Sequence, residues 1–322
     1  MTKYNWGIIG LGRIATTFAK FFPRADQNLY GAAARDEARA QSFARQHDIP
    51  QAYGSYAELY ADPRIDVVYI ATPHPFHYQQ IKDALNAGKH VLAEKSITLS
   101  SAQLDELIDL ARAKHLILME AQTIYHMPIY PAILDFATAH DLGKLKTIQV
   151  SFGSYAPNNP NDRLLNPNLG GGALLDIGVY ALSFARRFTD EPLELVATQM
   201  TETSTGVDGQ SSFLLKTADG VQVTVALNLQ AKMPKQGTVA YERGFFTLDQ
   251  YPRADNAIFA TPELKTQLLS AGDTTAALAT EVRDFAAAVT SGNNPTLPWT
   301  KNVMDIMTAA RAEWGFKFPG EK

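Results

Sequence analysis

The sequence predicts an α/β protein: a doubly wound parallel sheet at the N-terminus, then an α+β domain with a large, mostly antiparallel open sheet. Two observations support this fold class. Short apolar strands alternate with helices over the first 120 residues, and beyond them a few helices flank a long run of strands. Alternating strands and helices favour a parallel sheet covered on both faces. We expect the two domains to span residues 1–120 and 121–322.

The composition of the 322 residues is that of a globular protein, since 46% are hydrophobic and 19% are charged. The net charge of -4 gives no electrostatic basis for binding nucleic acid. The lack of cysteine excludes disulfides, cysteine–zinc sites and thiol nucleophiles, and we expect a cytoplasmic location. We expect neither a signal peptide nor a membrane span, because residues 1–5 lead directly into a strand and no run of about 18 apolar residues follows.

The first element is a strand–turn–helix unit in residues 6–15, WGIIGLGRIA. Its spacing is that of a Rossmann domain, in which Gly10 permits the tight turn, Gly12 lets the backbone approach a pyrophosphate, and Ala15 lets the helix pack on the strand. The N–H groups at the helix start attract phosphates. A glycine turn in another kind of strand–helix unit is the alternative. The residues expected to line the phosphate site are Gly10, Leu11, Gly12, Arg13 and Ile14.

Strands and helices then alternate up to residue 120. Apolar runs predict strands at residues 29–34, 52–53, 67–71, 90–93 and 116–120. Periodicity predicts helices at residues 13–22, 36–47, 55–60, 76–87 and 101–114. Ligands of such a sheet bind at the carboxyl ends of the strands, so the residues that follow each strand are candidates for a cofactor site.

The end of the second strand, Ala34-Arg35-Asp36, predicts which dinucleotide binds. An NAD site usually has an acidic residue there to hold the ribose 2′-hydroxyl. Ala34 leaves room, Arg35 offers a guanidinium fork to a 2′-phosphate, and Arg39 lies on the same helical face. Asp36 could still contact a ribose, although we favour it as the N-cap of the next helix. We therefore predict NADP(H) as the preferred cofactor and NAD(H) as the alternative.

Polar residues also follow the strand at 67–71, in the segment ATPHPFH at residues 71–77. Pro73 ends the strand and turns the chain across the expected path of the cofactor. We place Thr72, Pro73 and His77 in the cofactor site. A histidine of the helix cap or core is the alternative for His77, and we expect a positioning role.

A charged pair, Glu94 and Lys95, ends the following strand, although strand interiors rarely contain charged side chains. We place both in the cofactor site. Beside a bound nicotinamide, burial would lower the pKa of Lys95 toward the working pH, so that it could exchange a proton with a carbinol oxygen. A solvated pair in the loop after the strand is an equally good interpretation.

The second half begins with a helix that ends near residue 140. We expect a strand at residues 145–154, a polar loop at 156–169, a hairpin of strands 212–216 and 221–229, and helices at 275–289 and 301–314. Arg163 is the only cation in the sequence of the polar loop. It either anchors the loop on a carboxylate, which we favour, or lines a substrate pocket.

Three glycines at residues 170–172 lead into a helix predicted to reach residue 187. Asp176 and Tyr180 are four residues apart and so share one helical face, from which they could project into one pocket. The periodicity alone favours a simpler interpretation, in which Asp176 complements the helix dipole and Tyr180 belongs to the core.

Together these motifs resemble the glucose–fructose oxidoreductase, inositol dehydrogenase and rhizopine-catabolism (Gfo/Idh/MocA) family, and within it the dimeric dihydrodiol dehydrogenase and NADP-dependent D-xylose dehydrogenase branch. The resemblance covers nearly the whole chain. It is carried by GLGRIA at 10–15, AARD at 33–36, ATPHPFH at 71–77, AGKHVLAEKS at 87–96, GGGALLDIGVY at 170–180 and GFKFP at 315–319. Two positions depart from the family pattern. His74 stands where Asn is usual, and Ser96 stands where Pro is usual, which leaves the turn after Lys95 less rigid.

The resemblance implies an NAD(P)-dependent dehydrogenase or reductase that acts on the CH–OH or C=O group of a sugar, polyol or trans-dihydrodiol. It implies that Lys95, Asp176 and Tyr180 are catalytic, with Asp176 orienting the substrate and Tyr180 sharing the acid–base task with Lys95. The substrate would contact Lys95, Arg163, Asp176 and Tyr180. The resemblance also implies a homodimer or higher homo-oligomer formed through the second sheet. No metal, nucleic-acid or membrane partner is expected.

Two other functions stay open at this point. A regulator that senses NAD(P) would keep the fold and lose catalysis; Ser96 favours it weakly, whereas intact Lys95, Asp176 and Tyr180 argue against it. An enzyme of the same fold that reduces another carbonyl or an imine would need fewer hydroxyl-binding groups than Asp176 and the long loop imply.

Overall fold

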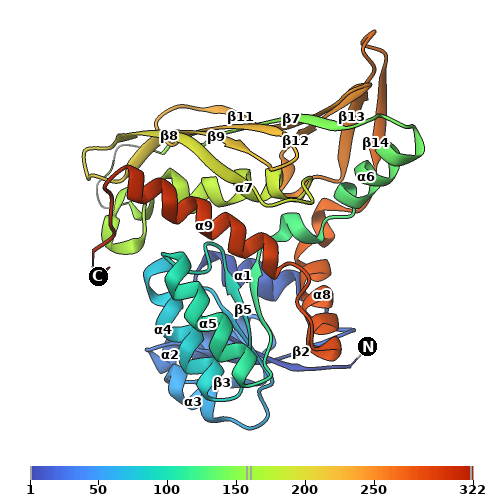
Figure 1. The fold of residues 1–322 in the computed structure, drawn as a ribbon. Coiled ribbons are helices and arrows are strands. Elements are labelled where there is room, and N and C mark those ends of the chain that lie inside the picture. The colour runs from blue at the N-terminus through green and yellow to red at the C-terminus, as the bar shows by residue number, and fades with distance from the viewer. Residues whose placement is uncertain (1, 157–158, 160–161, 320, 322) are drawn as a thin grey trace. The chain divides into compact units, whose positions relative to one another are not determined.

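The computed structural model describes residues 2–156, 159, 162–319 and 321, which form two compact units (Figure 1). The first unit consists of Met1–Gln122 together with Leu278–Leu297, and the second of Thr123–Ala277 together with Pro298–Lys322. Among the helices of the described residues, none combines the length and the apolar character that crossing a membrane would require.

The first unit is built on a six-stranded sheet of order β3-β2-β1-β4-β5-β6, in which all neighbours are parallel. The predicted doubly wound fold is thereby confirmed. The strand order reverses between β1 and β4, which is where ligands of such sheets bind. The strands are β1 (Asn5–Ile9), β2 (Asn28–Ala33), β3 (Gln51–Tyr53), β4 (Val67–Ile70), β5 (His90–Glu94) and β6 (Leu118–Ala121). The helices are α1 (Arg13–Phe21), α2 (Glu37–Gln46), α3 (Tyr56–Ala61), α4 (His77–Asn86) and α5 (Ser101–Ala113).

The first unit also includes most of α8 (Ala277–Ser291), which the sequence placed in the second domain. Phe285 is fully buried and packs edge-on against Trp6, with the ring centroids 5.1 Å apart. The predicted second domain of residues 121–322 is therefore wrong for the segment Leu278–Leu297. The physical reason is that the apolar face of α8 completes the core around Trp6, and such a long-range contact leaves no mark on the local pattern.

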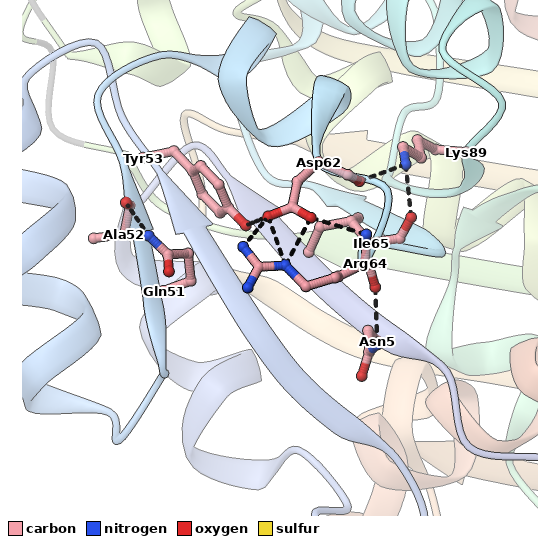
Figure 2. Close-up of polar contacts among 8 residues, drawn as sticks. All are labelled: Asn5, Gln51, Ala52, Tyr53, Asp62, Arg64, Ile65 and Lys89. Carbon is pink, nitrogen blue, oxygen red and sulfur yellow. Dashed lines mark hydrogen bonds and ion pairs between the residues drawn. The ribbon is translucent and has the colours of Figure 1, made fainter.

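A polar network fixes the chain just before β4 and β5 (Figure 2). The carboxylate of Asp62 accepts a hydrogen bond from the Tyr53 hydroxyl at 2.6 Å and pairs with Arg64 at 2.6 Å. The Lys89 Nζ donates to the carbonyls of Asp62 at 2.8 Å and Ile65 at 2.7 Å. The hydrogen bonds from Arg64 and Tyr53 hold the pKa of Asp62 well below its usual value. The network restrains the amino-terminal ends of the two strands, whereas ligands bind at the carboxyl ends.

The second unit is built on an eight-stranded sheet of order β14-β13-β12-β11-β7-β10-β9-β8. The pair β7 and β10 is parallel and the other neighbours are antiparallel, which confirms the predicted mostly antiparallel sheet. The strands are β7 (Leu145–Gly153), β8 (Glu194–Glu202), β9 (Asp208–Lys216), β10 (Gln222–Asn228), β11 (Met233–Tyr241), β12 (Gly244–Asp249), β13 (Asn256–Ala260) and β14 (Thr266–Ser270). The helices are α6 (Ile129–Ala139), α7 (Val179–Arg186) and α9 (Leu297–Glu313).

Helix α7 packs closely against this sheet because small residues permit the approach. A Cβ atom at Gly237 in β11 would collide with the Phe184 ring, and one at Gly178 would lie 2.8 Å from Leu227 in β10. The Phe184 ring also contacts that of Tyr251, which is fully buried, with the ring centroids 4.9 Å apart. Helix α7 is therefore held firmly at its start and in its middle.

The helix predicted after the glycine run begins with a π-helical turn, Leu174–Gly178, and continues as α7. Asp176 lies in the π-helical turn and Tyr180 in α7, four positions further on, so about one helical turn separates them. The predicted polar loop contains two short 3₁₀ turns, Arg163–Leu165 and Pro167–Leu169. Its residues 157, 158, 160 and 161 lie outside the described part of the chain.

Candidate active site

The turn after β1 is shaped by Gly10, which has a φ of +80°. A Cβ atom at Gly10 would lie 2.6 Å from backbone atoms of Ala71 and Thr72 at the end of β4, so a side chain there would force the turn away from that strand. At Gly12 a Cβ atom would meet no described atom within 4 Å, which leaves the backbone open at the start of α1. An open backbone beside free helix N–H groups fits the pyrophosphate of a dinucleotide.

Helix α2 starts one residue after Asp36. The Asp36 carboxylate accepts a hydrogen bond from the backbone N–H of Ala38 at 3.0 Å. The favoured interpretation of Asp36 as an N-cap is therefore confirmed, and its carboxylate is engaged by the helix.

Two arginines stand beside this helix start. Arg35 is exposed, and Arg39 donates to the Leu11 carbonyl at 2.8 Å, which ties α2 to the phosphate turn. Burial raises the pKa of Tyr56, and the positive charges of Arg35 and Arg39 oppose that rise. The charges of both guanidinium groups therefore act on one phenol, that of Tyr56 at the start of α3.

Two histidines from the segment after β4 hold the backbone after β5. The His74 Nε2 atom lies 3.1 Å from the Lys95 carbonyl oxygen. His77 is fully buried, with Nδ1 3.0 Å from the Ser96 carbonyl and Nε2 2.7 Å from the Thr72 carbonyl. Burial lowers the pKa of His77, and these backbone hydrogen bonds oppose the shift. The two imidazoles thus act as positioning groups for the turn that carries Lys95.

Glu94 is the last residue of β5 and Lys95 follows it, and both are partly exposed. The Glu94 carboxylate accepts hydrogen bonds from the Tyr69 hydroxyl at 2.5 Å and from the Lys95 N–H at 3.3 Å. The Lys95–Ser96 peptide bond is cis, and Ser96 is fully buried. Serine does not fix φ as proline would. The histidine and glutamate contacts supply the restraint that the serine lacks.

In the second unit, Asp176 and Tyr180 are the two residues of the stretch 170–186 that are partly exposed; all the others are buried. Arg163 donates to the Asp176 carboxylate at 3.2 Å. The favoured interpretation of Arg163, that it anchors its loop on a carboxylate, is therefore confirmed. This carboxylate belongs to Asp176, the predicted substrate-binding residue.

The predicted residues gather in two groups, one in each unit. The first unit brings the phosphate turn, the segment 71–77 and the Lys95 turn together at the carboxyl ends of β1, β4 and β5. The second unit brings Arg163, Asp176 and Tyr180 together at the start of α7. Over the described ranges, no group of three or more His, Asp or Glu side chains could hold a metal ion.

One buried acid, Asp208, was not predicted from the sequence. It is the first residue of β9, it is 2% exposed, and its Oδ2 atom accepts the Leu174 N–H at 2.7 Å. Burial raises the pKa of Asp208 to about 7, although the N–H groups of Leu174 and Ala173 and the charge of Arg311 favour its ionised form. A single acid at the start of a strand carries no periodic or motif signal, so tertiary contacts alone identify it.

This fold and its strand-end residues define the class of NAD(P)-binding oxidoreductases. Residues 4–122 match the model of an oxidoreductase family with an NAD-binding Rossmann fold, and residues 132–247 match a GFO/IDH/MocA C-terminal domain. The chain belongs to the GFO/IDH/MocA oxidoreductase family. The predicted family and enzyme class are confirmed.

The chain is similar to several characterised proteins. It is 36% identical over 251 residues to trans-1,2-dihydrobenzene-1,2-diol dehydrogenase of Xenopus laevis, covering 77% of this chain and 76% of that protein. It is 30% identical over 334 residues to the Homo sapiens protein of the same name, covering 99% of each. A 3-ketoreductase from Actinomadura kijaniata, solved in complex with NADP and TDP-benzene, has a TM-score of 0.84 at 26% identity, with 97% of each chain covered.

Asp208 makes the stability of the protein depend on pH in a defined direction. Its pKa is about 7 in the folded chain, against an ordinary value of 3.8, so the folded state binds the extra proton between these values. The contribution of Asp208 to the free energy of unfolding is therefore full below about pH 4 and is lost as the pH rises through about 7. We expect Asp208→Asn to lack this dependence.

Thermal melts of the wild type and Asp208→Asn between about pH 5 and about pH 8 check this prediction. The melting temperature of the variant should rise relative to that of the wild type as the pH increases. Two parallel curves would contradict a carboxyl group that titrates in the folded state.

Proposed function

We propose that this protein is an NADP-dependent dehydrogenase or reductase that acts on the CH–OH or C=O group of a sugar, polyol or trans-dihydrodiol. The observation that carries the proposal is the start of α7, where Asp176 and Tyr180 alone reach the surface of a buried segment in an oxidoreductase chain. The names of the dihydrodiol dehydrogenases and of the 3-ketoreductase complex with NADP support this class of substrate and this cofactor.

The contacts in the first unit support NADP(H) over NAD(H). Ala34 offers no acid to a ribose, and Asp36 is engaged as a helix cap. Arg35 is exposed at the end of β2, where its guanidinium fork suits a 2′-phosphate. The open backbone at Gly12 and the start of α1 would hold the pyrophosphate. The other residues that would hold the cofactor are Gly10, Leu11, Arg13, Ile14, Arg39, Thr72, Pro73, His77, Glu94 and Lys95.

When bound, NADP(H) would supply the hydride-transfer chemistry of the reaction. The task of the chain is then to hold the substrate and to move one proton. In this proposal the Lys95 Nζ and the Tyr180 hydroxyl exchange that proton with the substrate oxygen, and Asp176 accepts hydrogen bonds from neighbouring hydroxyls. Positioned acid–base groups of this kind contribute roughly 10²–10⁴ in rate.

In the proposed function, Arg163 acts through Asp176, whose carboxylate it holds. The side chains of the pair are 42% and 17% exposed, so neither is sealed off from a ligand. A carboxylate has several acceptor sites, so Asp176 can accept a substrate hydroxyl while Arg163 holds its other side. The ion pair would thus fix the direction in which Asp176 meets the substrate.

We also propose that the protein forms a homodimer or higher homo-oligomer through the second sheet. One face of this sheet has a hollow of about 610 Å³ that strands β7 to β11 line. Its lining residues have amide, hydroxyl or aliphatic side chains, apart from the aromatic Phe213, and none of them is charged. Charged residues are depleted in the cores of protein interfaces, so this face suits a second copy of the chain. The cytoplasmic location expected from the sequence stays a proposal.

Loss of Lys95 or Tyr180 should lower turnover, and loss of Tyr180, which is not among the residues proposed to hold the cofactor, should spare cofactor binding. We expect Lys95→Ala and Tyr180→Phe to lower kcat by about 10²–10⁴, because each removes a group that moves the proton. The measurement is NADP⁺ reduction with aldoses, polyols and a trans-dihydrodiol, alongside NADPH binding by fluorescence. Lys114→Ala, which changes an exposed lysine of the same unit, is the control. A wild type that binds NADPH and turns over none of these substrates would contradict the proposal and favour a nucleotide-sensing regulator.

Loss of Arg35 should weaken the binding of NADP⁺ and leave the binding of NAD⁺ nearly unchanged, because only NADP⁺ carries the 2′-phosphate. We expect Arg35→Ala to raise the KM for NADP⁺ by about 10- to 100-fold, the size of one charge-assisted hydrogen bond. Arg45→Ala, which changes an exposed arginine of the helix α2 that follows Arg35, is the control. Equal or better use of NAD⁺ by the wild type would instead assign the ribose contact to Asp36.

A charged residue in the hollow of the second sheet should separate the protomers. Sedimentation should give the wild type at least twice the chain mass of 35.3 kDa, and Thr224→Arg should shift it toward 35.3 kDa. The substitution buries an unpaired charge in the assembled state, which is costly. A monomeric wild type would overturn this part of the proposal.

A further inference from the structure

The segment that leads to Asp176 follows a path that two glycines make possible. A Cβ atom at Gly171 would lie 2.7 Å from the Leu164 carbonyl oxygen, and Gly172 has a φ of +114°. A Cβ atom at Gly172 would collide with the Oδ1 atom of Asp208. The Asp208 carboxylate therefore lies directly against the backbone that enters the π-helical turn.

That carboxylate also bonds to the first N–H groups of the turn. Its Oδ2 atom accepts the Leu174 N–H at 2.7 Å, and the Ala173 N–H favours its ionised form as well. The first N–H groups of a helix have no partner within the helix, so an acceptor from elsewhere must satisfy them when they are buried. Here the acceptor comes from β9, which ties the start of the helix to the sheet.

We propose that Asp208 is a positioning residue for the active site, whose carboxylate fixes the π-helical turn so that Asp176 and Tyr180 are held in their working orientation. This inference rests on the proposed function. Asp208 does not touch the substrate or the cofactor in this role. It acts through Leu174, which precedes Asp176 by two residues.

The positive charge of Arg311 supports the role of Asp208 as a buried, ionised hydrogen-bond acceptor. Burying a carboxylate is costly, and it is tolerated where donors and an opposite charge compensate it. Arg311 is 5% exposed and is itself held by Glu321, through hydrogen bonds of 2.6 and 2.9 Å. Its charge stabilises the ionised form of Asp208. An apolar residue at position 208 would avoid the cost of burial but leave the helix start unsatisfied.

The test compares two variants of the full chain. Asp208→Asn keeps the size and one acceptor oxygen, whereas Asp208→Ala removes the acceptor. We expect Asp208→Ala to lower kcat by about 10- to 100-fold, since small displacements of reacting groups cost that much, and to leave NADPH binding within about twofold. Asp208→Asn should keep kcat within about threefold of the wild type.

Asp62→Ala is the matched control, because Asp62 is also a buried, hydrogen-bonded aspartate but belongs to the network in the first unit. It should lower the melting temperature and leave kcat of the folded protein unchanged. An Asp208→Ala variant that folds with wild-type kcat would overturn the inference. So would an Asp208→Asn variant that loses as much kcat as Asp208→Ala, or a loss of the same size in Asp62→Ala.

Should Asp208→Ala fail to fold, Asp208→Ser replaces it, because the serine hydroxyl is one bond shorter than the carboxylate arm that accepts the Leu174 N–H, and the same loss of kcat is expected. Failure of the inference is distinguishable from failure of the proposed function. A wild type without turnover contradicts the function, whereas an active wild type with fully active Asp208 variants contradicts only the role of Asp208.

Discussion

The first unit depends on one steric constraint, the contact between the turn after β1 and the end of β4. Because Gly10 has no side chain, its backbone approaches Ala71 and Thr72 to a distance that a Cβ atom would forbid. The Thr72 carbonyl is in turn one of the two that flank His77, and the Ser96 carbonyl is the other. The positions of the phosphate turn and of the turn that carries Lys95 are thus linked through packed backbone and a single buried imidazole.

In the second unit, the turn that leads to Asp176 is also fixed by a close approach at a glycine, but the contacting group is different. Gly172 again permits a close approach, but the group that approaches is the Asp208 carboxylate rather than another backbone. The first unit holds its turn with histidines, for which burial favours the neutral form of His77. The second unit uses ionisable acids that need compensating donors, as Asp208 has in Leu174 and Asp176 has in Arg163. Backbone carbonyls bound to histidines, together with the Glu94 carboxylate, hold the site residues of the first unit, and carboxylates bound to a backbone N–H or to an arginine hold those of the second.

Features whose cause is local could be predicted from the sequence. The alternation of strands and helices follows from apolar periodicity, and the cap at Asp36 from the chemistry of helix starts. Features whose cause is tertiary could not. The bond from His74 to the Lys95 carbonyl spans 21 residues, and that from Leu174 to Asp208 spans 34. Periodicity shows which face of an element is buried, but it does not show which partner covers it, so α8 was assigned to the wrong unit.

The return of α8 to the first unit has a consequence for the order of events on the ribosome. The residues that surround Phe285, among them Trp6 and Phe22, are translated first, but Phe285 follows only after the whole of Thr123–Ala277. At about 5–20 residues per second, the nascent chain carries this incomplete core for roughly 8–30 s. During that interval an aromatic surface near the N-terminus lacks its cover. The cofactor-binding unit, although it comes first in the sequence, is thus the unit that is completed late in synthesis.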